Sequence, residues 1–236
     1  MSVFILGEQL IFPDPAYADP DGLLAVGGDL SMERLVSAYA HGIFPWYSST
    51  TPILWWSPDP RPIIEPIKII VSRSLRKLLR KLPFQITLDR AFEDVIAACA
   101  KTKRPQGEGT WLISEMIEAY VDMHEAGLAH SVEAWQDGRL VGGLYGVSLG
   151  RAFFGESMFF HVPNASKTAF VTLNRLLTQW EFHFVDCQQS TPHMLNFGAQ
   201  EVSRREFLAR LRAAIQHPTR RGRWEMPAGF CESLEW

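Results

Sequence analysis

The sequence has few cysteines, and the three present, Cys99, Cys187 and Cys231, lie far apart without a C-x-x-C pair. This pattern is typical of a reducing compartment and argues against a disulfide framework or a cysteine zinc site. No apolar run approaches the ~18 residues that a membrane span needs. The N-terminus lacks the basic and apolar regions of a signal peptide. We therefore expect a cytoplasmic protein that makes no membrane contact.

The sequence also lacks an excess of positive charge. Its 23 Lys and Arg residues are outnumbered by 26 Asp and Glu, for a formal net charge of −3. This excludes a globally basic nucleic-acid binder, so any contact with nucleic acid must come from a local patch. Apolar residues make up 47% of the chain and charged residues 21%, which favours a packed core over a disordered chain.

The first part of the chain differs in composition from the rest. It is rich in Pro, Gly and aromatic residues, as in F-P-D-P and W-W-S-P-D-P-R, with one helix expected between Ser31 and Gly42. From Ile63 onward, helix and strand patterns mix without a strict βαβ order. We predict an α+β protein with a small N-terminal domain, residues 1–62, and a larger domain, residues 63–236.

Apolar spacing places the elements of the larger domain. Helices are expected after Ser72, after Asp89 as an N-cap, after Ser114, over 165–180 and after Ser203, where S-R-R-E forms a capping box. Strands are expected over 84–88, 131–135, 140–149, 151–160 and 182–187, with a hairpin turn at Asp137-Gly138.

Two short segments place polar side chains among the apolar residues of expected strands. Glu156 lies in G-E-S-M-F, and Asp186 and Gln188 lie in D-C-Q, one helix further along the chain. Polar groups are costly to bury unless they are hydrogen-bonded, so three near one another indicate a functional site. A hydrogen-bonded structural network would produce the same pattern, and spacing alone leaves both interpretations open.

Covalent and metal-assisted catalysis fit the sequence poorly. Ser157 lacks the closing glycine of a nucleophile elbow, and a lone Cys187 in a strand is usually part of a core. The histidines lack metal-ligand spacing, and neither a P-loop nor a dinucleotide-binding fingerprint is present. We therefore expect no metal.

The helix after Ser72 indicates a positively charged surface. Opposite its leucines it carries five cations with no acid between them, namely Arg73, Arg76, Lys77, Arg80 and Lys81. Like charges on adjacent turns repel by ~0.2–0.5 kcal/mol per pair, which an anionic partner would offset. The pattern favours phosphate-backbone binding over a solvated helix face. Trp46 and Trp111, in loop-like segments, are candidates for stacking on a base.

A series of motifs lies between Gly22 and Arg205. In order, they are G-L-L-A-V-G-G-D-L-S, G-I-F-P-W-Y, I-L-W-W-S-P-D-P-R, G-E-G-T-W, H-S-V-E-A-W, L-V-G-G-L-Y-G-V, G-E-S-M-F, N-A-S-K-T-A and D-C-Q. The series resembles the leucyl/phenylalanyl-tRNA–protein transferases of bacteria. The resemblance implies a GNAT-like acyltransferase domain that moves Leu, Phe or Met from aminoacyl-tRNA to an N-terminal Arg or Lys of an acceptor protein. This transfer marks the acceptor for N-degron proteolysis. No cofactor is implied, and the Q/R-x-x-G-x-G loop that binds coenzyme A in other GNAT enzymes is absent.

The resemblance also implies roles for individual residues. Gln188 and Asp186 fall at catalytic positions, and Glu156 falls where an acid holds the acceptor's amine. Trp46 and Trp111 match tryptophans that contact the terminal adenosine. The aminoacyl side-chain pocket corresponds to Leu144, Phe153, Met158, Phe170, Leu173 and Val185. The basic cluster that meets the acceptor stem of the tRNA corresponds to Arg76, Lys77, Arg80 and Lys81.

The implied reaction is aminolysis of an ester that is already activated, so neither ATP nor a covalent enzyme intermediate is needed. Three alternatives compete with it: a coenzyme A-dependent acetyltransferase, a Fem-type peptidyltransferase and a non-catalytic RNA-binding module. The sequence leaves open the role of Thr191, which precedes Pro192, and that of the segment after His217.

Overall fold

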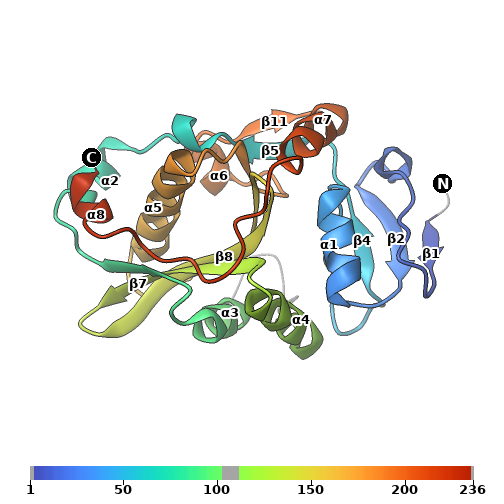
Figure 1. Cartoon of the computed structure of the whole chain (residues 1–236), viewed down its shortest axis with the longest axis horizontal. Helices are drawn as coiled ribbons and strands as arrows, with labels where there is room; N and C mark the ends of the chain where they lie inside the picture. Colours follow the sequence, from blue (N-terminus) through green and yellow to red (C-terminus); the bar gives the residue numbers. More distant parts are fainter. Residues whose placement is uncertain (1–2, 103–111, 235–236) are drawn as a thin grey trace.

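The computed structural model describes residues 3–102 and 112–234, which form two mixed β-sheets and their helices (Figure 1). The smaller sheet contains β1 (Phe4–Leu6), β2 (Leu23–Gly27), β3 (Phe44–Pro45) and β4 (Leu54–Trp56). Its strand order is β1-β2-β4-β3, with β1 and β2 parallel and the other pairs antiparallel. A 3-10 turn, η1 (Pro15–Tyr17), precedes β2, and helix α1 (Met32–Ala40) connects β2 to β3.

The larger sheet contains β5 (Arg61–Ile64), β6 (Gln85–Leu88), β7 (Ala129–Gln136), β8 (Arg139–Leu149), β9 (Ala152–Phe160), β10 (Phe184–Asp186) and β11 (Gln200–Val202). Its strand order is β11-β5-β10-β9-β8-β7-β6. The pair β9–β10 is parallel, whereas the other neighbours in this sheet are antiparallel. The α+β class predicted from the sequence is therefore confirmed.

The remaining helices are η2 (Pro66–Lys68), α2 (Arg73–Leu79), α3 (Phe92–Lys101), α4 (Ser114–Glu125), α5 (Ala165–Gln179), α6 (Pro192–Asn196), α7 (Arg204–Ala214) and α8 (Phe230–Ser233). Helix α5 covers one face of the larger sheet, and α3 and α4 lie on the other face (Figure 1). None of the described helices is long and apolar enough to cross a membrane.

Two apolar clusters hold these layers together. One lies between α5 and the sheet, and we call it the α5 cluster; it includes Leu144, Phe153 and Leu173. The other includes Trp55 of the smaller sheet and Phe154 of the larger sheet, so one continuous core joins the two sheets. The domain boundary expected between residues 62 and 63 falls inside β5, and the division into two domains stays a prediction.

Local sequence signals explain several element ends. The turn residues Asp137 and Gly138 have φ angles of 50° and 72°, as a tight hairpin between β7 and β8 requires. The Ser203 hydroxyl accepts the N–H of Glu206 at 3.2 Å and caps α7. Helix α2 is capped in the same way by Ser72, which accepts the N–H of Leu75 at 3.3 Å.

The prediction that Asp89 caps a helix is wrong. Helix α3 begins at Phe92, and its N-cap residue is Ala91. The buried Asp89 carboxylate instead accepts the backbone N–H groups of Ser131 and Trp224 at 2.8 and 2.7 Å. It therefore ties the C-terminal part of the chain to β7, a long-range contact that local sequence spacing does not reveal.

Candidate active site

The candidate site lies where the parallel strands β9 and β10 separate. Their last paired position sets Asp186 opposite Phe154. Beyond it, β9 continues along β8 to Phe160, while the chain after β10 turns away. Glu156 and Gln188 each lie two residues past this last pair, so the point of separation brings both side chains together.

Glu156 is the extra residue of a β-bulge. In the β8–β9 ladder, Tyr145 pairs with Ser157 and Gly146 pairs with Gly155, which leaves Glu156 without an opposite residue. Bulges interrupt the regular alternation of a strand and change the direction of side chains. The bulge therefore gives Glu156 an orientation that a regular strand would not.

The bulge also brings two predicted pocket residues to the same face. Phe153 and Met158 are an odd number of positions apart, so regular alternation would place them on opposite faces of β9. With the bulge between them, Phe153 belongs to the α5 cluster and Met158 packs against it. Leu144, directly opposite Met158 on β8, lies in the same cluster.

Three side chains hold the Glu156 carboxyl group. Gln188 donates from Nε2 to Glu156 Oε1 at 2.6 Å. Tyr39 of α1 donates to Oε1 at 2.7 Å, and Tyr120 of α4 donates to Oε2 at 3.0 Å. Because α1 packs on the smaller sheet and Glu156 lies in the larger one, the site is assembled from both parts of the chain.

The two tyrosines carry too few hydroxyl protons to give every close oxygen pair around Glu156 a hydrogen bond. The Tyr39 and Tyr120 hydroxyl oxygens are also 2.5 Å apart, so three oxygen pairs share two hydroxyl protons when Glu156 is ionised. A proton on Glu156 supplies the third. Burial raises the pKa of Glu156 to about 7, the hydrogen bonds from Tyr39, Tyr120 and Gln188 oppose the rise, and Asp186 adds to it.

Asp186 is fully buried and forms an ion pair with Arg61 of β5. Arg61 donates from Nε and from one terminal nitrogen to the two carboxylate oxygens at 2.8 and 2.7 Å. Its guanidinium group also lies over the rings of Phe44 and Phe207, 4.8 and 4.5 Å from their centroids. Because both charges are paired within the core, Asp186 is positioned for a structural task and not as a free base.

Asp186 fixes the backbone of Gln188. The backbone N–H of Gln188 donates to Asp186 Oδ1 at 2.9 Å, and Gln188 has a left-handed φ of 60°. A residue other than glycine rarely adopts this conformation, and such residues cluster at functional sites. The Gln188 side chain, 9% exposed, therefore reaches Glu156 from a constrained backbone.

The structure brings together the six residues predicted to form the aminoacyl pocket. Its six residues belong to the α5 cluster or pack against it: Leu144, Phe153, Phe170, Leu173 and Val185 are buried, and Met158 is half-buried. They come from β8, β9, β10 and α5, which meet beside the point where β9 and β10 separate. Apolar residues of this kind are suited to contact an aliphatic or aromatic side chain.

Of the residues predicted to contact the tRNA, those that the structure describes lie on the surface. Trp46 is 40% exposed, and its ring packs edge-on against Trp56 with centroids 5.7 Å apart. Trp111 lies outside the described residues. Arg76 and Lys77 lie on α2, and Arg80 and Lys81 follow its last helical residue; all four side chains are exposed.

Sequence reasoning missed three residues of this site, namely Arg61, Tyr39 and Tyr120. One signal was available for Arg61, which precedes the apolar run Pro62–Ile64, because a charge at the start of a buried strand requires an opposite charge. The tyrosines had no such signal, since they lie on the apolar faces of α1 and α4.

Other polar candidates have structural roles. Thr191 caps α6 by accepting the N–H of Met194 at 3.2 Å. Burial raises the pKa of the Cys187 thiol, which disfavours the thiolate that nucleophilic attack needs. Within residues 3–102 and 112–234, no group of three or more His, Cys, Asp and Glu side chains is arranged to hold a metal ion.

Comparisons with known proteins assign the chain to a family. The model of the leucyl/phenylalanyl-tRNA protein transferase family matches residues 63–212, and that of its N-terminal domain matches residues 28–59. The chain is 59% identical over 226 residues to the leucyl/phenylalanyl-tRNA–protein transferase of Desulfatibacillum aliphaticivorans, covering 96% of this chain and 97% of that protein. It is 57% identical over 229 residues to the transferase of the same name from Anaeromyxobacter sp. (strain Fw109-5), covering 97% of each.

The chain therefore belongs to the leucyl/phenylalanyl-tRNA–protein transferase family. Among solved structures, a functionally unknown conserved protein from Staphylococcus epidermidis aligns with a TM-score of 0.39 and 11% identity over 77% of this chain and 68% of that one. A similarity this weak does not define the fold.

Proposed function

We propose that the protein transfers Leu, Phe and Met from aminoacyl-tRNA to the N-terminal Arg or Lys of acceptor proteins, which marks them for N-degron proteolysis. Family membership supports the reaction class. The observation that carries the assignment of the site is the 2.6 Å hydrogen bond between Gln188 and Glu156, beside the apolar residues under α5. Charged tRNA is a cytoplasmic substrate, so the proposal also places the reaction in the cytoplasm.

In the proposed reaction, the α-amine of the acceptor attacks the ester carbonyl carbon. A C–N bond forms and the C–O bond to the 3′-oxygen breaks. The attacking nitrogen loses one proton, which passes through the neighbouring 2′-hydroxyl to the leaving 3′-oxygen. The attacking amine must be neutral. An α-amino group has a pKa of ~7.7–8.0, and the pKa of Glu156 is about 7, so a proton passes between them at little energetic cost.

Glu156 is therefore proposed to draw in the cationic acceptor terminus and to take its proton. Gln188 is proposed to position the amine: its Nε2 group is held by Glu156, which orients the amide oxygen as an acceptor for the attacking N–H. An amide is a poor base, so positioning is its main contribution, and positioning alone can supply several kcal/mol. Asp186, paired with Arg61, holds the Gln188 backbone in place.

The finer architecture is also part of this proposal. A mixed sheet in which two parallel central strands separate beside the site supports a GNAT-like acyltransferase fold for residues 63–236. Residues 1–62 are proposed as a small domain that contributes Tyr39 to the site. Trp46 and Trp111 are proposed to contact the terminal adenosine, and Arg76, Lys77, Arg80 and Lys81 to contact the acceptor stem.

The direct test is transfer of labelled Leu from charged tRNA to a casein-like acceptor with an N-terminal Arg, beside a parallel reaction with acetyl-coenzyme A. We expect transfer from the tRNA alone. The variant Gln188→Ala is expected to lower kcat by about 10²-fold or more, the effect of a lost positioning contact. Its matched control is Gln189→Ala, because Gln189 is the exposed neighbour of Gln188.

The outcomes separate the alternatives. Acetylation without aminoacyl transfer would make the protein a coenzyme A-dependent enzyme, and tRNA binding without transfer would make it a binding module. Near-normal turnover in both Gln188→Ala and Gln188→Glu would remove Gln188 from the mechanism.

A further inference from the structure

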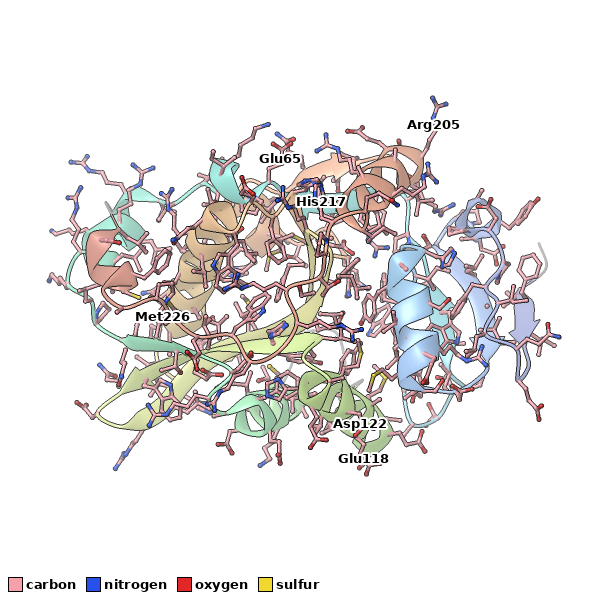
Figure 2. All side chains as sticks on the ribbon, viewed as in Figure 1. Glu65, Glu118, Asp122, Arg205, His217 and Met226 are labelled. Carbon is pink, nitrogen blue, oxygen red and sulfur yellow. The ribbon has the colours of Figure 1, made fainter. Side chains whose placement is uncertain are left out.

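Residues 215–226, which we call the C-terminal segment, cross the molecule between α7 and α8 (Figure 1). Figure 2 labels His217 and Met226, which lie near the two ends of this crossing. The match to the family's main domain ends at residue 212, before this segment begins. Most of the segment is exposed or half-buried, but Trp224 is only 2% exposed, so the segment contributes one large side chain to the interior.

Two hydrogen bonds and a stacked ring help to hold Trp224 in place. The backbone N–H of Trp224 donates to Asp89 Oδ2 at 2.7 Å, and its indole Nε1–H donates to the carbonyl of Arg220 at 3.0 Å. Its ring stacks on His130, with centroids 3.7 Å apart and planes 8° from parallel. An aromatic ring held at its backbone, its polar atom and one face has little freedom to move.

The fixed indole contacts a residue of the proposed aminoacyl pocket. The Trp224 ring lies 5.9 Å from the ring of Phe153, measured between centroids. Strand β8 confines the same Phe153 ring, because a Cβ atom at Gly146 would lie only 2.6 Å from its Cε1 and Cζ atoms. Phe153 is 1% exposed, so its ring position is set by these neighbours and not by solvent.

From this packing we infer that Trp224 is a positioning residue that sets the depth of the aminoacyl side-chain pocket by supporting Phe153. The inference rests on the proposed function, in which Phe153 lines that pocket. Trp224 acts through Phe153: without the indole, the Phe153 ring can retreat into the space left behind it. The pocket then deepens, and a larger aminoacyl side chain gains contact while Leu loses it.

The test compares substrates in one variant. For Trp224→Ala we expect the ratio of kcat/KM for Phe-tRNA to that for Leu-tRNA to rise by about tenfold, the lower limit for one methylene group in an apolar pocket. Trp224→Phe retains a ring at this position, and we expect its ratio to stay within about twofold of the wild type. A purely structural role would lower transfer of both amino acids in parallel and leave the ratio unchanged.

Phe230→Ala is the matched control. Phe230 also lies in the C-terminal part of the chain, is 8% exposed and belongs to the α5 cluster, but no Phe153–Phe230 ring contact occurs among the described residues. We expect this variant to lose stability without a change in the substrate ratio. If Trp224→Ala does not fold, Trp224→Leu serves for the same comparison.

The results distinguish a failure of the proposed function from a failure of the inference about Trp224. A wild-type protein that transfers neither Leu nor Phe would overturn the proposed function and this inference with it. A wild-type protein that transfers both, with an unchanged ratio in Trp224→Ala or Trp224→Leu, would overturn the inference alone.

Discussion

At the residue scale, Glu156 has a raised pKa, and its hydrogen-bonded group lacks one proton when Glu156 is ionised. Its carboxyl group and the Tyr39 and Tyr120 hydroxyl groups form three close oxygen pairs. Each pair has a hydrogen to share only when Glu156 is protonated. Burial also raises the pKa of both tyrosines, so each stays a protonated donor. The proposed base is thus in equilibrium between its two forms near neutral pH.

This balance predicts how activity depends on pH. If Glu156 must be ionised to act, kcat/KM for the acceptor rises as the pH increases through about 7, the pKa of this group in the free protein. The hydrogen bond from Tyr39 lowers that pKa, so Tyr39→Phe should move the rise to higher pH. Each unit of upward shift reduces activity below the pKa about tenfold. Measuring kcat/KM for the acceptor in Leu transfer from pH 5.5 to 9 tests this.

The control for the pH profile is Tyr17→Phe, because Tyr17 is 67% exposed and does not contact Glu156. It should leave the profile unchanged. A profile that is the same in Tyr39→Phe, Tyr17→Phe and wild type would assign the ionisation to the acceptor amine and not to Glu156.

At the scale of secondary-structure elements, the pair Arg61–Asp186 links β5 to β10. Removing one partner leaves a buried charge without compensation, so Arg61→Met should destabilise the protein by about 3–5 kcal/mol. The double variant Arg61→Met/Asp186→Leu removes both charges and should be more stable than Arg61→Met. Urea unfolding of the three proteins measures the difference. Equal stabilities of the single and double variants would show that the buried charge is not the cause.

Elements of regular periodicity could be predicted from the sequence, and interruptions of that periodicity could not. The helix expected over 165–180 is α5 (Ala165–Gln179), and the strand expected over 151–160 is β9 (Ala152–Phe160). The bulge at Glu156 left no local signal, because it arises from the register between β9 and β8. It nevertheless decides which residues of β9 face α5.

At the scale of the whole molecule, α2 and the smaller sheet lie at opposite ends of the long axis (Figure 1). A tRNA that reaches Trp46 near the smaller sheet as well as α2 would have to extend along most of the protein. Because the chain carries a net charge of −3, this contact would depend on local cations, and binding should weaken steeply as salt increases.

Removing three of these cations tests the contact. We expect Arg76→Ala/Lys77→Ala/Lys81→Ala to weaken tRNA binding and to reduce the slope of log K against log salt by about 1 for each cation that contacts a phosphate. The control is Arg205→Ala, an exposed cation on α7 that points away from the protein (Figure 2). Filter binding between 50 and 300 mM salt measures both slopes. A slope equal to that of the wild type would remove α2 from the tRNA interface.

The sequence by itself determined the fold class and the family, and it supplied several residues of the candidate site. Apolar periodicity reflects local burial, and the motifs around Glu156, Asp186 and Gln188 are contiguous in the chain. Only the tertiary structure decided how these groups are arranged. Arg61 reaches Asp186, two tyrosines reach Glu156, and Trp224 reaches Phe153 across long stretches of sequence. Such pairings depend on strand order, register and the packing of distant elements, which no local pattern of residues encodes.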